Sequence, residues 1–150
     1  AGILHPDEGA VTSDTTETPD LHVLGHGSAV KARLTVRENL DFWRILYGPT
    51  GMDTAAALDR VGLAHAAGFD AEILSAGQTR RLALARLLVS RRAVWLLDEP
   101  TAALDSEGSR LVGEMIDAHA QSGGAVIVAT HERLALTVPH RSLRLGSPAP

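Results

Sequence analysis

Leu74-Ser75-Ala76-Gly77-Gln78 and Val94-Trp95-Leu96-Leu97-Asp98-Glu99 are the two stretches that decide the fold of this chain. The first predicts a turn that opens a helix. The second predicts a buried strand that ends in two adjacent carboxylates. A strand that is apolar along its length is typical of a parallel sheet with helices on both faces. We therefore expect an α/β fold.

The segments around these stretches alternate between helical and strand patterns. Thr35 and Glu38 have the spacing of a capping box. The expected strands are 21–24, 94–98, 125–129 and an edge strand at 143–145, and the expected helices are 35–47, 54–61, 76–90, 106–121 and a short one after His131. Residues 11–20 are expected to form a surface loop or an irregular hairpin. The alternation predicts a doubly wound sheet with a helical insertion.

Composition limits the possible functions of the chain. Its 150 residues suffice for one domain with a core, and 45% of them are hydrophobic. The net charge of −4 does not favour a nucleic-acid partner, and the absence of Cys excludes disulfides and thiolate metal sites. No apolar run approaches the roughly 20 residues that span a bilayer. Any action at a membrane is therefore expected to need a partner.

Asp98 and Glu99 follow a buried strand, at the carboxyl edge where open α/β sheets bind ligands. A single strand-end carboxylate suits Mg²⁺, which prefers oxygen ligands and retains most of its waters. Glu99 can orient and polarise a water that attacks a phosphate. The alternative is that Asp-Glu-Pro only ends the strand with turn-forming residues.

Ser75, Ala76 and Gly77 begin the predicted third helix, and a helix N-terminus with exposed N–H groups can bind an anion. Glycine at position 77 allows another backbone or a ligand to approach closely. The alternative is a plain N-cap in which Ser75 satisfies the first turn. Arg80 and Arg81, further along, are interpreted as a solvated helix face.

Together with Pro100-Thr101-Ala102-Ala103-Leu104-Asp105 and Thr130-His131, these motifs resemble those of ATP-binding cassette (ABC) ATPases. The resemblance implies a P-loop NTPase-like sheet with helices on both faces and an inserted helical subdomain at about residues 35–90. It further implies ATP and Mg²⁺ as cofactors. Residues 1–146 would form a partial ABC ATPase domain, and residues 147–150 a disordered tail.

The same resemblance implies a head-to-tail homodimer and a role for each motif. The signature residues would contact the ATP of the partner subunit, and Asp105 in the D-loop would cross the dimer interface. The implied residues are Asp98 for Mg²⁺ through water, Glu99 as catalytic base, His131 for the γ-phosphate, and Ser75, Ala76, Gly77 and Gln78 as the signature.

His26 departs from the pattern, because the loop after this strand usually carries a glutamine in ABC ATPases. A histidine can supply a donor or a ligand nitrogen. Coupling to a membrane partner through this loop can therefore be retained. The alternative is an ordinary loop histidine without a function.

No G-x-x-x-x-G-K-[ST] motif occurs in the 150 residues. The first nine residues resemble the stretch that follows a P-loop helix, so we expect an N-terminal truncation with the P-loop lysine upstream. The alternative is a paralogue that has lost its nucleotide cradle. In either case these 150 residues alone are expected to be inactive and not to bind ATP measurably.

The segment from Gly25 and His26 through Lys31, Thr35 and Glu38 to Phe42 resembles the haem-exporter ATPases of cytochrome c biogenesis. That subfamily implies permease subunits as partners and a peripheral location on the cytoplasmic face of the bacterial inner membrane. The alternatives are an ATPase subunit of another ABC importer or exporter, and a P-loop-less, non-hydrolytic regulatory subunit. The transported substrate and its direction do not follow from these residues.

Overall fold

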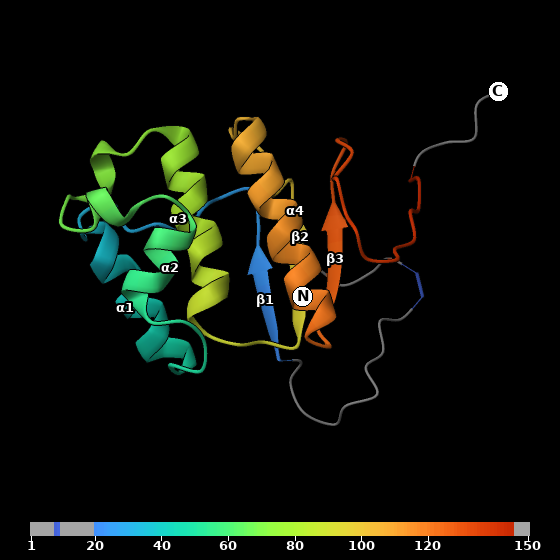
Figure 1. Ribbon diagram of the computed structural model, residues 1–150, viewed down its shortest axis with the longest axis horizontal. Coiled ribbons are helices and arrows are strands. Elements are labelled where there is room, and N and C mark those ends of the chain that lie inside the picture. Colours follow the sequence, from blue (N-terminus) through green and yellow to red (C-terminus); the bar gives the residue numbers. More distant parts are fainter. Residues whose placement is uncertain (1–7, 10–19, 146–150) are drawn as a thin grey trace.

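Three parallel strands form the sheet, in the order β1 (Leu21–Leu24), β2 (Val94–Asp98) and β3 (Ala125–Ala129) (Figure 1). The computed structural model describes residues 8–9 and 20–145. Most of the first nine residues, residues 11–19 of the predicted loop and the predicted tail at 147–150 lie outside these ranges. Pairing of β2 with both neighbours places all three carboxyl ends at one edge.

The helices between β1 and β2 occupy the range predicted for the helical subdomain, whose boundaries remain a prediction. They are α1 (Val36–Tyr47), α2 (Thr54–Arg60), two short 3₁₀ helices (Ala64–Ala66 and Ala71–Ile73) and α3 (Ala76–Val89). The predicted capping box is confirmed: the Thr35 hydroxyl accepts from Glu38 N at 3.2 Å, and the Glu38 carboxylate accepts from Thr35 N at 2.8 Å. Gly48, at φ 87°, ends α1.

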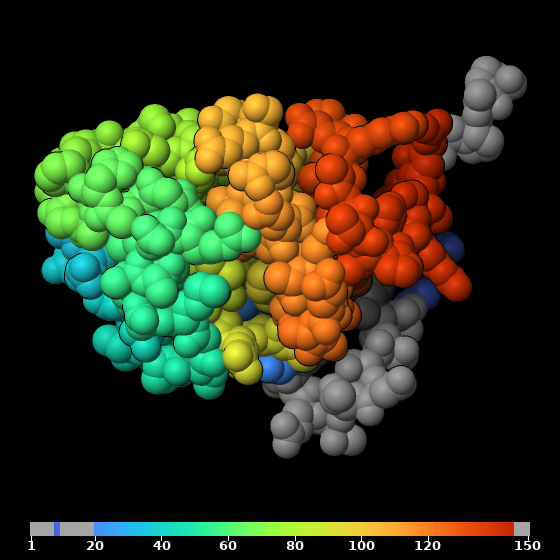
Figure 2. Space-filling view, in the orientation of Figure 1, coloured from blue at the N-terminus to red at the C-terminus, as the bar shows by residue number. Residues whose placement is uncertain are grey.

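Helix α3 is buried almost all round, because α1 and α2 pack on one side of it and the sheet on the other. Figure 2 shows the resulting surface, with the green helical segment on one side, α4 in the middle and the red C-terminal segment on the other side. The buried apolar residues of α3 are Leu82, Ala83, Leu84, Ala85, Leu87 and Val89. A helix in this position has little room for a solvated face.

One face of the sheet packs into the core, and its buried side chains include Leu24, Trp95 and Leu97. Helix α4 (Ser106–Gln121) contributes Leu111, Val112, Met115 and Ile116 to the same core. The other face is apolar too, but in the described residues it is half-buried at β1 and exposed at Ile127 of β3. The predicted α/β class is confirmed.

His22 on β1 is only 2% exposed. Its Nε2 lies 2.9 Å from the carbonyl oxygen of Ser90, and its ring meets the edge of Tyr47. Burial lowers the pKa of His22 to about 4, so the ring is neutral at physiological pH. This buried imidazole joins β1 to the end of α3.

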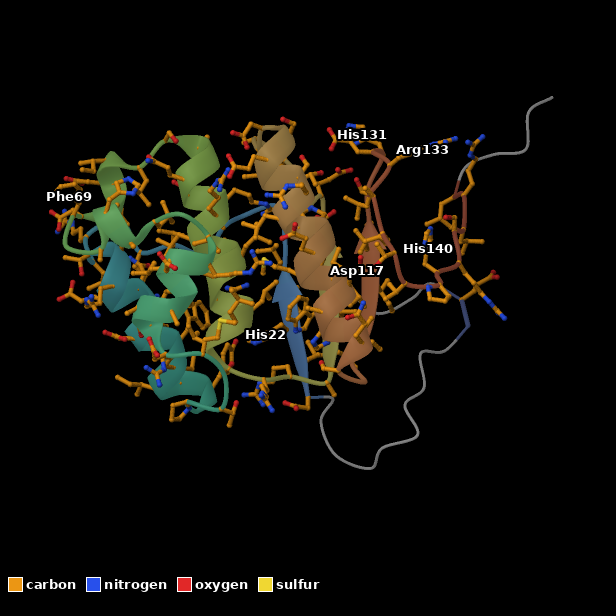
Figure 3. The ribbon with its side chains drawn as sticks, in the orientation of Figure 1. His22, Phe69, Asp117, His131, Arg133 and His140 are labelled. Atoms are coloured by element: carbon orange, nitrogen blue, oxygen red, sulfur yellow. The ribbon has the colours of Figure 1, made fainter. Side chains whose placement is uncertain are left out.

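Two predicted elements after β3 are wrong: in the described residues 131–145 no helix follows His131, and residues 143–145 form no strand. The Asp117 carboxylate of α4, which Figure 3 labels, accepts hydrogen bonds from Thr137 N and Val138 N at 2.9 and 3.2 Å. These N–H groups are therefore used by a side chain rather than by helical carbonyls. A contact with α4, distant in sequence, determines the path of this segment.

Candidate active site

The predicted chemistry-bearing residues meet at the carboxyl edge of the sheet. β1 leads into Gly25 and His26, β2 ends at Asp98, and β3 leads into Thr130 and His131. The N-terminal ends of α3 and α4 lie at the same end of the molecule as the strand arrowheads (Figure 1), and His131 is labelled there in Figure 3. Loops and helix ends from five elements therefore lie at one end of the molecule.

Glu99 and His131 are in direct contact. One oxygen of the Glu99 carboxylate lies 2.9 Å from His131 Nδ1 and accepts from His131 N at 3.2 Å. The other accepts from the Thr130 hydroxyl at 3.2 Å. Glu99 also has a left-handed backbone with φ 44°, a conformation that non-glycine residues rarely adopt and that is common at functional sites. The sequence predicted both residues but not this contact.

The contact shifts both titrating groups. The hydrogen bond from His131 lowers the pKa of Glu99, and the same bond raises the pKa of His131. Both shifts favour the ion pair. The His131 side chain is 81% exposed and that of Glu99 30%, so solvent screens the attraction and the pair can separate readily. The Glu99 carboxylate is therefore held by His131, a partner that another group can replace.

Asp98 is exposed at the end of β2, and no hydrogen-bond donor in the described residues contacts its carboxylate. Within those residues, no cluster of three or more His, Asp or Glu side chains could hold a metal. Asp98 can thus offer one hard oxygen ligand. That fits Mg²⁺, which binds through one or two carboxylates, substrate phosphates and several waters.

The start of α3 is capped as the alternative interpretation proposed. Ser75 Oγ accepts from Gln78 N at 3.2 Å, and Gln78 Oε1 accepts from Ser75 N at 3.0 Å. The N–H groups of Ala76 and Gly77 have no acceptor in the described part of the chain, as expected in a first helical turn. A capped N-terminus with two open donors can receive an anion, so the two interpretations are compatible.

Gly77 is required by a contact within the chain. A Cβ at this position would lie 2.9 Å from the carbonyl oxygen of Ala103, in the segment between Glu99 and α4. Ala103 itself has φ 64°. The missing side chain therefore lets this segment approach the tip of α3.

We expect Gly77→Ala to lower the free energy of unfolding by about 1–3 kcal/mol, since its methyl group overpacks against Ala103. Ala76→Gly, the reverse change on the exposed neighbour, should cost at most about 1 kcal/mol. Urea denaturation of both variants measures the difference. Stabilisation by Gly77→Ala, as helix propensity alone would predict, would disprove the contact.

Asp105 caps α4 and bridges to α3. Its Oδ1 accepts from Gly108 N at 2.8 Å and pairs with Arg81 Nη2 at 3.0 Å. The hydrogen bond from Gly108 is the main reason why the pKa of Asp105 is lowered. His26, in contrast, is exposed and makes no hydrogen bond within the described residues.

Arg80 corrects the interpretation of a solvated face. It is 4% exposed and donates to main-chain carbonyls at the ends of β1 and β2, whereas Arg81 is partly exposed and pairs with Asp105. The signal was present in the sequence: Arg80 shares a helical stripe with Leu84 and Leu87, both buried. Among the functional candidates, this residue is the one that sequence reasoning missed.

Comparison with known proteins agrees with this geometry. The family described as ABC transporter matches residues 1–102. The chain is 49% identical to the cytochrome c biogenesis ATP-binding export protein CcmA of Rhodopseudomonas palustris strain BisB5, covering 99% of this chain and 76% of that protein. It is 48% identical to the protein of the same name from Rhizobium johnstonii, covering 91% of this chain and 68% of the relative.

Two solved structures share the fold. The dimeric, post-hydrolysis ATP-binding cassette MJ0796 bound to ADP and Pi matches with a TM-score of 0.67 and 25% identity, over 76% of this chain and 53% of that chain. RNase-L Inhibitor matches with a TM-score of 0.66 and 25% identity, over 85% of this chain and 24% of its own. Both matches agree with the parallel sheet and its helices.

Proposed function

Because this chain belongs to the ABC transporter family, we propose that the full-length protein is the ATP-hydrolysing subunit of an export complex in cytochrome c biogenesis, of the haem-exporter type that the sequence resembles. The observation that carries the proposal is the position of Asp98, Glu99 and His131 at one sheet edge, with the open N-terminus of α3 at the same end of the molecule. The identity of 49% to an export protein of cytochrome c biogenesis supports the specific pathway.

We assign the chemistry to three side chains. Asp98 would hold Mg²⁺ through water, and the ion, when bound, supplies positive charge to the phosphate oxygens. Glu99 accepts a hydrogen bond from the attacking water and orients it. His131 leaves Glu99 and donates to the γ-phosphate. The exposed, screened pair of Glu99 and His131 is suited to this exchange.

The signature residues Ser75, Ala76, Gly77 and Gln78 would serve the ATP of a second copy in a head-to-tail homodimer. Support comes from the free N–H groups of the first turn of α3, which face no described acceptor. The related cassette MJ0796, described as dimeric and bound to ADP and Pi, is consistent with this arrangement. Asp105, at the neighbouring start of α4, would lie at the same interface.

The membrane partner would be a permease. No helix in the described ranges is both long and apolar enough to cross a bilayer. Helix α1 exposes Phe42, Ile45 and Leu46 at helical spacing, with Ile45 85% exposed. We assign this face and the loop with His26 to contact with the permease at the cytoplasmic face of the inner membrane.

Deleting the gene tests this function. Cells without the protein should lose covalently bound haem in their c-type cytochromes, measured by haem staining. Full-length wild-type protein should restore it, Glu99→Gln should not, and Glu72→Gln, which alters an exposed carboxylate on another element, should restore it. Normal cytochrome levels in the deletion strain would instead assign the subunit to a different ABC system.

A further inference from the structure

Arg80 joins parts of the site that are far apart in sequence. Its Nη1 donates to Gly25 O at 2.9 Å, and its Nη2 donates to Asp98 O at 2.7 Å and Glu99 O at 2.6 Å. Its Nε donates to Pro100 O at 3.3 Å. All four acceptors are main-chain carbonyls, which lie just after β1 and at or just after the end of β2. No described carboxylate forms an ion pair with this guanidinium.

These bonds fix the backbone of Glu99 from both sides. Glu99 N donates to Ala129 O of β3 at 2.8 Å, while Glu99 O accepts from Arg80 of α3. A non-glycine residue at φ 44° persists only where the surroundings hold it. Arg80 therefore helps to hold the backbone that aims the Glu99 carboxylate.

Arg80 also belongs to the helix whose tip is Ser75. The helix between Ser75 and Arg80, about a turn and a half long, is nearly rigid, so a displacement of Ser75 also displaces Arg80. Movement of the tip must then either carry the ends of β1 and β2 with it or break hydrogen bonds of a buried cation, which is costly. The tip of α3, the loop after β1 and Glu99 are thus linked through one side chain.

We propose that Arg80 is a positioning residue that couples the nucleotide contact at the tip of α3 to the orientation of Glu99. The inference rests on the proposed function and adds a link between sites. In a head-to-tail dimer, the α3 tip serves one nucleotide and Glu99 of the same subunit serves the other. Through Arg80, occupancy of one site determines the alignment of the base in the second.

Arg86 provides a matched control on the same helix. It is buried and donates to a main-chain carbonyl, that of Val23, but this carbonyl lies within β1 and not at the catalytic edge. Replacing either arginine removes a buried guanidinium from α3. Only Arg80 contacts the residues that carry the proposed chemistry.

The test measures kcat and KM for ATP, with thermal unfolding, in full-length Arg80→Lys and Arg86→Lys. A lysine keeps the charge but lacks the planar fork that reaches four carbonyls. We expect Arg80→Lys to lower kcat by about 100-fold through misplacement of Glu99, with little change in KM. Arg86→Lys should lower Tm but leave kcat within about threefold of wild type.

Unchanged kcat in a folded Arg80→Lys would overturn the proposal, and so would equal losses of kcat in both variants. If Arg80→Lys does not fold, amide hydrogen exchange of the wild type decides: on addition of a non-hydrolysable ATP analogue, protection should rise together at 75–80, 24–26 and 98–102. Independent changes would overturn the coupling. Failure of the proposed function can be distinguished from failure of the coupling, because it would appear as normal ATP turnover in Glu99→Gln.

Discussion

Glu99→Gln in the full-length protein is expected to lower ATP turnover by about 1,000-fold, because the amide cannot accept the proton of the attacking water. The substitution keeps size and shape, so ATP binding should remain. Thr130 and His131 can still contact the side chain. We therefore expect an ATP-bound dimer to accumulate, measured as phosphate release and as the dimer fraction in size-exclusion chromatography with ATP.

Glu72→Gln is the control for this substitution, since Glu72 is exposed and lies in a 3₁₀ helix before α3. It should hydrolyse ATP at the wild-type rate. Normal phosphate release by Glu99→Gln would remove Glu99 from its assigned role and leave Asp98 and the bound water without a base. A wild-type protein that binds ATP without releasing phosphate would instead favour a non-hydrolytic regulatory subunit.

The second large effect concerns stability and pH. Burial lowers the pKa of His22 to about 4 in the folded protein, against 6.5 for an unperturbed histidine. Between these values the unfolded chain binds the proton more tightly, so stability falls as pH decreases. The contribution of neutral His22 to the free energy of unfolding is complete above pH 6.5. About 3 kcal/mol of this contribution should be lost when the pH is lowered to 4.

Urea denaturation of the wild type and of His22→Gln at several pH values between 4 and 7.5 measures this contribution. The variant should be less stable at pH 7.5 but should show a shallower decrease on acidification. His65→Gln, which changes an exposed histidine, should keep the wild-type slope. Equal slopes in wild type and His22→Gln would show that another group causes the pH dependence.

Local signals in the sequence predicted most of the fold. The capping box at Thr35 and Glu38, the glycine stop at Gly48 and the continuous apolar runs of β2 and β3 each act over a few residues. The segment after His131 was predicted wrongly, because Asp117 determines its path from 20 residues away. The hydrophobic periodicity of the sequence does not indicate such long-range contacts.

The candidate site divides in the same way. Motif spacing identified Asp98, Glu99 and His131, but the contact of Glu99 with His131 depends on the pairing of β2 with β3. The burial of Arg80 can be read from its helical stripe, but its hydrogen-bond partners cannot, because they are carbonyls 18 to 55 positions away in the chain. Every residue type has a main-chain carbonyl, so no sequence pattern indicates which carbonyls Arg80 contacts.

A mixed-dimer experiment tests the central claim, that each α3 tip completes the site of the other subunit. One full-length subunit carries Glu99→Gln and the other carries Ser75→Asp, which keeps an N-cap acceptor on an exposed residue while its carboxylate repels phosphate at the helix N-terminus. Each homodimer should be inactive. In a head-to-tail pair, one site combines both defects and the other site is intact.

Differently tagged subunits should be mixed, the heterodimer purified through both tags, and its ATP hydrolysis measured. The account predicts that ATP hydrolysis reappears in the heterodimer, above that of either parent but below that of one wild-type site, because the altered α3 tip lies in the subunit whose Arg80 aligns the remaining Glu99. If the tip of α3 acted on the nucleotide of its own subunit, both sites would be defective. A purified heterodimer as inactive as its parents would contradict the account.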